Sequence, residues 1–539
     1  MNFNLLGLLS KPLTLAILFF AIPPALAILF PFSLWSGSDY ELLSLANALN
    51  MAYRLADFKL YAALGLSDHP GVPFYVLSWL ALAITGHPLG LPGLTLFNPV
   101  VESVEKFHFA AICLAALTGA AAVFIFARSA QKLVPPWVAV TAIAIWLFCS
   151  PATILTFASP GNESFAFFIN SLFFAVLMKL AFEQPIKWQT FVLAGCIGAI
   201  AYLNKLSYVY VPVALLAATT VKLIVGRAGW IRGIRLSAVG LLAFMLTTLA
   251  VAYFVIGWSG FRQVLGFHLR VFLGSGLYGE GNQTVVSGSA VWNALLAIPA
   301  DRTCAVLLGL IGGIGVGFFG IVTALRKPQH LSIAVLSIGA GVAASASSLI
   351  VLKHYRDYYT AGVSATLPLC FVCGYLLVKA AERRLEARYH LVGILMALLM
   401  AWPVAESVLR QLRNTSEKSR LAKLDAAEIS VLTAHGKLAA YYTYKTPFAE
   451  FGEGFVIRYA SVPRLTEAYL QNEQNILNTI TSGTTAKKVG IYVIDKKYFG
   501  SADAIRNAPN LDLLGPKPVT YREGDRLVEL RTVFLLVRG

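Results

Sequence analysis

Charged residues are scarce in this chain. Asp, Glu, Lys and Arg make up 13% of its 539 residues, whereas soluble globular domains carry about 25%. The hydrophobic fraction is 57%, and the mean hydropathy is +0.69. The composition therefore excludes an ordinary soluble protein and indicates a multi-pass integral membrane protein, with membrane lipids as its surroundings.

The apolar segments also lack the alternation of polar and apolar residues that a transmembrane β-barrel requires. They are instead continuous runs of about 20 apolar residues, long enough for a helix to cross a ~30 Å hydrocarbon core. A helix satisfies its backbone groups internally, as lipid demands. We expect a polytopic α-helical membrane protein.

Cysteines are few, and none follows residue 373. Most of the six lie inside apolar runs, which argues against a disulfide framework. Cys370 and Cys373 form a CxxC without a second pair, and we interpret them as packing residues. Nucleic-acid motifs are absent too, so the net charge of +16 does not indicate a nucleic-acid partner.

Basic residues gather in short turns between apolar runs, and this decides the topology. If residues 72–88 crossed the membrane, the following basic clusters would face outward, against the positive-inside rule. We therefore interpret 72–88 as an interfacial or re-entrant helix within a long first outer loop, 34–107. The clusters that then face the cytoplasm include Arg128, Lys132, Lys222, Arg227, Arg232, Arg235, Arg326, Lys327, Lys379, Arg383, Arg384 and Arg388.

About eleven spans follow, with the N-terminus cytoplasmic and the C-terminus outside. The first apolar run is expected to be a retained anchor. The layout is compatible with a bacterial inner membrane. The expected spans are 13–33, 108–127, 137–152, 163–182, 188–203, 206–225, 236–257, 303–325, 331–351, 359–380 and 390–406.

Two outer loops carry further predictions. Helical spacing of apolar residues indicates a surface helix at 40–60. A second outer loop, 258–302, contains Phe267-His268-Leu269-Arg270 and a glycine-rich stretch at 274–282, which suggests mobility or close approach to a ligand.

The composition changes after residue 406. We divide the chain into a membrane domain, 1–406, and a small outer (periplasmic) α/β domain, 407–539. Strands are expected at 488–495 and 533–537, and helices at 421–439 and 463–481.

Acidic residues stand at two outer helix ends, where ionisable groups are costly and usually functional. Asp39 follows the first span and could act as a general base or cap a helix; Glu41 could replace it. Glu163 opens a span, either as a second catalytic acid that orients an acceptor or as a favourable charge at a helix N-terminus.

Basic and aromatic residues occupy other outer turns. Lys205 lies between two spans and suits a phosphate, although a lone lysine often only snorkels. The densest cluster joins two spans and offers cations for phosphate and rings for sugar faces; an interfacial aromatic belt is the alternative. Its members are Lys353, His354, Tyr355, Arg356, Asp357, Tyr358 and Tyr359.

A metal is a further option. His69 begins the interfacial segment, and it could join four other outer residues around a divalent cation, although no ligand spacing is diagnostic. The other four are Asp39, Glu41, Glu163 and His354.

Taken in order, these motifs resemble the GT-C superfamily of integral-membrane glycosyltransferases, closest to the protein-mannosyltransferase and aminoarabinose-transferase type. The motifs are Asp39 after the first span, Asp68-His69-Pro70-Gly71, Glu163 after an outer Ser-Pro, the Lys205 turn and His354-Tyr355…Tyr358-Tyr359. The likeness covers about residues 10–380. The family commonly has His-Pro-Pro where this chain has His69-Pro70-Gly71, which weakens any subfamily assignment.

The resemblance implies inverting transfer of a sugar, a hexose or pentose, from a polyprenyl-phosphate donor to a glycan, lipid or protein acceptor. It implies that Asp39 is catalytic. The basic turns, with Lys205, Lys353, His354 and Arg356, would hold the lipid phosphate; Arg270 and Tyr355 belong to the same expected binding surface. Alternatives are a transporter or flippase of lipid-linked or anionic solutes, and a membrane glycan polymerase or ligase.

Overall fold

The structure is a computed structural model of the whole chain. It describes residues 11–31, 39–56, 71–86, 104–185, 187–225, 230–253, 257–274, 287–381, 386–433, 438–441, 489–511 and 520–538. The side chains of Asp39 and Glu41 lie outside this description, although the backbone of α3 includes them.

The chain is a polytopic helical membrane protein. Nine helices in the described ranges are long and apolar enough to cross a membrane, and the bent pair α7–α8 makes a tenth. Together with the shorter α10, they account for all eleven expected spans. The helices are α2 (Pro12–Leu29), α6 (Val104–Ala130), α7 (Pro136–Phe148), α8 (Pro151–Ala158), α9 (Ala166–Phe182), α10 (Trp188–Asn204), α11 (Tyr210–Val225), α12 (Trp230–Val251), α15 (Ala305–Arg326), α16 (Leu331–Lys353), α18 (Leu367–Ala381) and α19 (Glu386–Thr433).

The bend between α7 and α8 differs from the straight span expected at 137–152. The two helices meet at 78°, and Pro151 opens the second one. Proline lacks a backbone N–H and disfavours helical geometry in the residue before it. Ser150 has an extended backbone, and its hydroxyl accepts a hydrogen bond from the Ala152 N–H as an N-cap.

Small residues let neighbouring helices approach closely, as is common between helices in lipid. Gly309, Gly313 and Gly317 follow each other at four-residue intervals along α15. A Cβ on Gly313 would lie 2.9 Å from the carbonyl oxygen of Gly341 in α16. The core between the helices is aromatic in places, with the rings of Trp146 and Phe167 stacked 3.8 Å apart.

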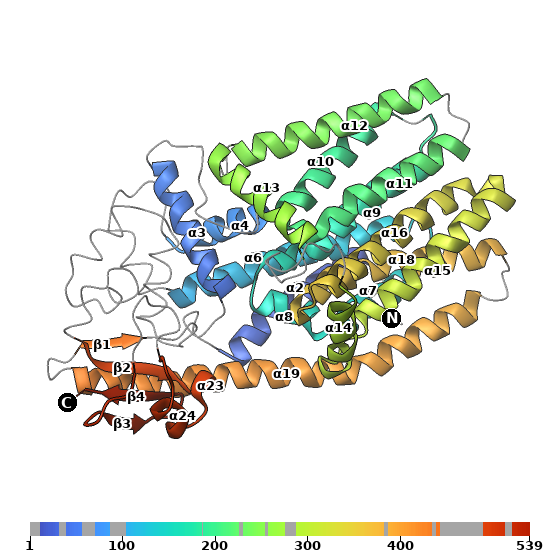
Figure 1. The fold of residues 1–539 in the computed structure, drawn as a ribbon. Helices are drawn as coiled ribbons and strands as arrows, with labels where there is room; N and C mark the ends of the chain where they lie inside the picture. Colours follow the sequence, from blue (N-terminus) through green and yellow to red (C-terminus); the bar gives the residue numbers. More distant parts are fainter. Residues whose placement is uncertain are drawn as a thin grey trace.

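The turns expected to face the cytoplasm meet at one end of the bundle, which we call the basic end. There the Lys222 ammonium donates to the carbonyl of Ala181 at 2.7 Å, and Lys327 donates to the carbonyl of Ala380 at 3.0 Å. Figure 1 shows the α15–α16 connection on this same side, together with the end of α11, the start of α12, the end of α18 and the start of α19. The basic turns therefore lie at the same end of the bundle, as predicted. The compartment that each end faces stays a prediction.

The opposite end, which we call the site end, collects the turns expected to lie outside. Two contacts join helices there. The Cys304 N–H, just before α15, donates to the carbonyl of Cys149, just before α8. Arg302, also before α15, pairs with Glu406 of α19 at 2.7 Å. The Ser416 hydroxyl donates to the carbonyl of Pro31, just beyond α2. These segments lie at one end because an odd number of spans separates each of them, along the chain, from every basic turn.

Two helices belong to the first outer loop. Helix α3 (Asp39–Ala56) lies where a surface helix was expected, and it packs against α4 (Val72–Ile84). With 13 residues, α4 is about 20 Å long and too short to span ~30 Å of hydrocarbon. The Gly71 N–H donates to the carbonyl of Asn204, which places the start of α4 at the site end.

The second outer segment is more helical than expected. It contains α13 (Gly257–Leu273) and α14 (Gly288–Ala300). Most of the glycine-rich stretch at 274–282 lies outside the described residues, as do His69 and the helix expected at 463–481.

The C-terminal part carries a four-stranded sheet with the order β1–β2–β4–β3. Strands β2 (Val489–Asp495) and β4 (Val533–Val537) confirm the two predicted strands; β1 (Leu438–Tyr441) pairs parallel with β2, and β3 (Arg526–Glu529) pairs antiparallel with β4. Helix α19 runs through residue 406 without a break and leads to this sheet (Figure 1). The buried Asp425 of α19 accepts hydrogen bonds from Thr532 and Arg531, which join helix and sheet.

Candidate functional site

A buried ion pair forms the centre of the site end. The Lys205 ammonium donates to Glu163 Oε1, and both residues are nearly inaccessible, at 2% and 6% exposure. Glu163 lies in the 3₁₀ turn η3 (Asn162–Phe165) ahead of α9, and Lys205 lies between α10 and η4 (Leu206–Val209). Leaving either charge buried alone would be strongly destabilising, so the two residues are held together.

Two tyrosine rings cover the ammonium group. Lys205 Nζ lies 3.9 Å from the ring centroid of Tyr359 and 5.5 Å from that of Tyr358. The two rings meet edge to face, with centroids 4.6 Å apart. Both rings come from η7 (Asp357–Tyr359), between α16 and α18. Cation–π contact is favourable where water is excluded, so three turns that are distant in sequence share one polar centre.

Backbone contacts tie the first outer loop to this centre. The Asn204 side-chain amide donates to the carbonyl of Asn162 at 2.9 Å, and the carbonyl of Asn204 accepts from the Gly71 N–H at 3.2 Å. Gly71 has φ of +53°, and a Cβ there would lie 2.7 Å from the Tyr75 ring and 2.9 Å from Asn162 Oδ1. Both its backbone angle and the lack of space require glycine at the start of α4.

Hydroxyl groups line the neighbouring part of the centre. Ser150 and Thr360 share a hydrogen bond of 2.6 Å between α8 and α17 (Thr360–Ser364). The Tyr208 phenol is buried and has no hydrogen-bond partner within the described part of the chain. A Cβ on Gly362 would lie 3.7 Å from the Tyr208 hydroxyl, so glycine leaves space beside that group. Buried hydroxyl groups without a hydrogen-bond partner are rare in folded proteins, and a functional role is one explanation for them.

The remaining residues of the predicted basic turn contact α13 and α14. Lys353 Nζ donates to the carbonyls of Val271 and Phe272 at 3.0 and 2.6 Å, and His354 Nε2 lies 3.4 Å from the carbonyl of Val271. These carbonyls belong to the last turn of α13, where a cation is favourable. The Lys353 cation therefore caps a helix in this structure.

Tyr355 faces α14 instead. Its hydroxyl donates to Asp301 Oδ2 at 2.8 Å. Burial, followed by the hydrogen bond to Asp301, raises the pKa of the Tyr355 phenol, so it remains a protonated donor at neutral pH.

Two arginines stay accessible at the site end. Arg356 and Arg270 are exposed, and neither makes an ion pair with another residue in the described ranges. Arg270 lies in the last turn of α13, beside the Phe267 ring. Bidentate guanidinium groups of this kind suit a phosphate.

His268 supplies a further polar contact inside α13. Its Nδ1 lies 3.0 Å from the hydroxyl of Tyr202, and the side chain is 3% exposed. Burial lowers the pKa of His268 to about 4, so the ring is neutral at physiological pH.

Of the predicted site residues, Glu163, Lys205, Tyr358 and Tyr359 thus come together directly. Lys353, His354 and Tyr355 lie at the same end of the bundle but contact other partners, and Arg356 and Arg270 are exposed there. Asp39 begins α3; its side chain, that of Glu41, and all of His69 lie outside the described residues. The sequence reasoning missed Asn162, Asn204, Tyr208 and Asp301, because buried amide, hydroxyl and carboxylate groups next to turns leave no pattern of their own.

The divalent metal stays a prediction. Within the described ranges no three His, Cys, Asp or Glu side chains come close enough to hold a metal ion. Three of the five proposed ligands are not covered by that statement.

Comparison with known proteins adds the following. No family model matches the sequence. No curated protein matches it either. Two crystal structures of ArnT from Cupriavidus metallidurans are similar to the chain, one bound to undecaprenyl phosphate and one in the apo state. Both are 13% identical, each comparison covers 96% of this chain and 97% of ArnT, and the TM-scores are 0.49 and 0.44. Likeness at this level assigns the chain neither a family nor a substrate.

Proposed function

We propose that this protein is a membrane glycosyltransferase of the GT-C type, which transfers a sugar from a polyprenyl-phosphate donor at the site end of the bundle. The observation that carries the proposal is the buried Glu163–Lys205 pair beneath Tyr358 and Tyr359. It joins three of the motifs on which the family resemblance rests. The acceptor is a glycan, a lipid or a protein.

The chemistry needs an acid–base group and cations at the boundary between lipid and water. The acceptor hydroxyl attacks the anomeric carbon, its proton passes to the Asp39 carboxylate, and the bond from the anomeric carbon to the phosphate oxygen breaks. The electron pair of that bond leaves with the lipid phosphate. Attack opposite the leaving phosphate inverts the anomeric centre. A cleft poor in water limits hydrolysis of the donor.

The leaving phosphate requires positive charge that other residues do not already neutralise. Arg356 and Arg270 meet this condition best, since both are exposed and neither is ion-paired within the described chain. Lys205 is neutralised by Glu163, so its role is to hold that carboxylate and the tyrosine rings in place. Lys353 and His354 act through α13, whose last turn they contact.

Glu163 has one oxygen left for a substrate. Lys205 donates to Oε1, and no described residue donates to Oε2. A sugar or acceptor hydroxyl could donate to Oε2, while the tyrosine rings offer faces for a sugar. Glu163 then orients a hydroxyl group, and Asp39 removes the proton.

A transporter would favour charged groups in mid-span. Here Glu163 and Lys205 lie at helix ends, in the turns that begin α9 and follow α10. This position suits a reaction on one side of the membrane better than passage through it.

The direct test uses the purified full-length protein in proteoliposomes with polyprenyl-phosphate sugars extracted from the source membrane. We expect free polyprenyl phosphate and a glycosylated acceptor to form, and mass spectrometry detects both products. A strain without the protein should accumulate the unused lipid-linked sugar. Movement of the intact lipid-linked sugar across the vesicle membrane, with no glycosylated product, would instead identify a flippase.

A further inference from the structure

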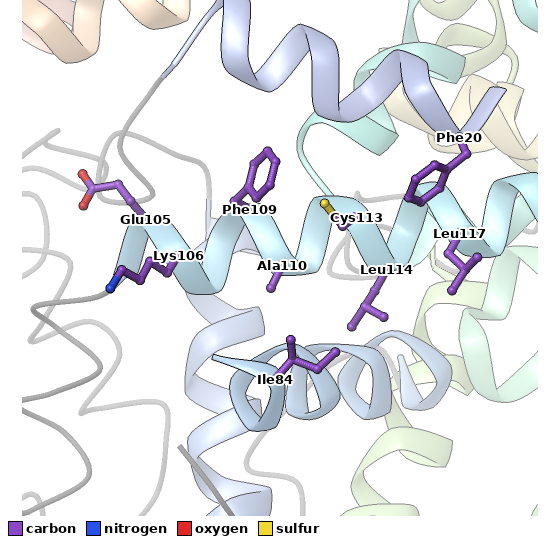
Figure 2. Close-up of a pocket in the computed structure, with 9 residues that line it drawn as sticks. All are labelled: Phe20, Ile84, Glu105, Lys106, Phe109, Ala110, Cys113, Leu114 and Leu117. Carbon is purple, nitrogen blue, oxygen red and sulfur yellow. The ribbon is translucent and has the colours of Figure 1, made fainter. Parts of the chain in front are cut away.

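A cavity lies away from the polar centre, in a groove between α2, α4 and α6. It has a volume of about 630 Å³, within the ~300–1,000 Å³ typical of ligand sites. Figure 2 shows Phe20 of α2 and Ile84 of α4 facing the side chains that α6 contributes. The α6 residues are Glu105, Lys106, Phe109, Ala110, Cys113, Leu114 and Leu117.

The groove is polar at one end and apolar along the rest. Glu105 and Lys106 stand at the start of α6, and every lining residue from Phe109 onward is apolar or a cysteine. Figure 2 shows the two charged side chains together at one end of the row. This division matches an amphiphile that has a headgroup and an apolar chain.

The length of the groove fits one leaflet. From Glu105 to Leu117 the helix rises through 12 residues, or about 18 Å at ~1.5 Å per residue. Half of a ~30 Å hydrocarbon core is about 15 Å. Both α2 and α6 are long and apolar enough to span the membrane, so lipid is the solvent that this groove faces.

The charges at its mouth favour an anionic headgroup. Glu105 is paired with Lys423 of α19, at 3.9 Å. Lys106 is exposed and makes no ion pair with any residue in the described ranges. The cation is therefore available to a phosphate, while the neighbouring carboxylate is already compensated.

We propose that this groove binds one acyl chain of an anionic phospholipid, with the phosphate of its headgroup beside Lys106. The occupant is a phospholipid and not the polyprenyl carrier, because the chain of such a carrier is several times longer than a groove of about 18 Å. Helix α4 connects this lipid site to the polar centre: Ile84 lines the groove, and Gly71, before the first turn, contacts Asn204.

The test uses the full-length protein in phosphatidylcholine nanodiscs that contain a small fraction of phosphatidylglycerol with a photoreactive acyl chain. We expect crosslinks on α6 peptides that include Cys113, Leu114 and Leu117. Lys106→Glu should lower phosphatidylglycerol labelling by at least about fivefold, since one basic residue contributes roughly that factor to binding of anionic lipid. Arg413→Glu, an exposed change on α19, should leave labelling unchanged.

A second variant addresses the apolar part. Leu117 is 56% exposed on the rim, so Leu117→Trp should fill the groove without disturbing the core, and it should abolish α6 labelling by both phosphatidylglycerol and a photoreactive phosphatidylcholine. Leu241→Trp on α12, which is 61% exposed, is the matched control. Equal labelling of the wild type by the two lipids would overturn the proposal. So would loss of labelling when unlabelled polyprenyl phosphate is added at the same mole fraction, because the groove would then belong to the donor.

Discussion

At the scale of single residues, the charge of the site end is decided by which ionisable groups find partners. Lys205 and Lys353 both lie in turns that suggest phosphate binding. Yet Lys205 is paired with Glu163, and Lys353 donates to two backbone carbonyls. Arg356 and Arg270 remain exposed. The accessible cations are therefore guanidinium groups, whose planar donors match a phosphate better than an ammonium does.

The Glu163–Lys205 pair gives the first prediction. Glu163→Gln or Lys205→Met alone should destabilise the protein by about 3–5 kcal/mol, because each leaves an unpaired buried charge. The double variant Glu163→Gln/Lys205→Met should recover much of that stability, as measured by thermal unfolding in detergent, while transfer activity stays lost. Independent, additive losses in the single variants would show that the two charges are not coupled.

Asp39 gives the second prediction. Asp39→Asn removes a proton acceptor but keeps the shape of the side chain, so we expect sugar transfer to fall by about 10²–10⁴ with unchanged expression and thermal stability. Glu41→Gln is the matched control on the same turn of α3, and it should retain most activity. Full transfer by Asp39→Asn would remove this residue from the mechanism; loss with Glu41→Gln instead would move the base to Glu41.

His268 gives a prediction about pH. Its pKa is about 4 in the folded protein, below the ordinary value of ~6.5, so the unfolded chain binds a proton first as the pH falls. The free energy of unfolding is therefore unaffected by His268 above about pH 6.5 and decreases as the pH falls toward 4. The total decrease that this residue can cause is about 3 kcal/mol. Between about pH 4 and pH 6.5, the unfolding temperature of His268→Gln should therefore change less with pH than that of the wild type.

At the scale of elements, short helices and turns between the spans build the site. Most of α9 and α10 is apolar, and their polar contacts lie in η3 and at Asn204–Lys205. The bend between α7 and α8 brings Ser150 to Thr360. A straight helix at 137–158 would continue past this position, so the proline after Ser150 helps to shape the polar centre.

Helix α13 carries a prediction at this scale. Lys353 contacts the carbonyls of its last turn, and a cation there contributes about 0.3–1 kcal/mol. Lys353→Met should therefore speed amide hydrogen exchange in residues 264–273 by about two- to fivefold. Arg356→Met, a neighbouring exposed change, should leave the exchange rates as they are. Unchanged exchange in Lys353→Met would mean that the contact does not hold α13.

At the scale of the whole molecule, an odd number of crossings separates the basic end from the site end. The hydrogen bonds of Lys222 and Lys327 lie at one end, and those of Arg302 and Ser416 at the other. Because the C-terminal sheet follows α19, it belongs to the same side as the site. This arrangement allows the sheet to cover the site or to present an acceptor.

The topology prediction concerns two exposed positions. Lys187 lies between α9 and α10, and Asp503 lies in α24 (Ala502–Arg506) of the C-terminal part. In intact cells, a membrane-impermeant maleimide should label Asp503→Cys and should label Lys187→Cys only after the membrane is opened. The wild type, whose cysteines lie in membrane helices or beside their ends, provides the background. Labelling of both positions in intact cells would contradict the proposed parity.

The sequence by itself determined which segments are helical spans, which turns are basic, and where two of the four sheet strands lie, because hydropathy, charge and strand patterns are local along the chain. It could not determine the partners of ionisable groups. Glu163 and Lys205 are 42 residues apart, and whether they meet depends on how α9 and α10 pack. The tertiary structure decided that Lys205 is neutralised, that Lys353 caps α13, and that Gly71 meets Asn204. These choices rest on distances between helices, and in a low-dielectric interior such distances decide which charges can remain unpaired.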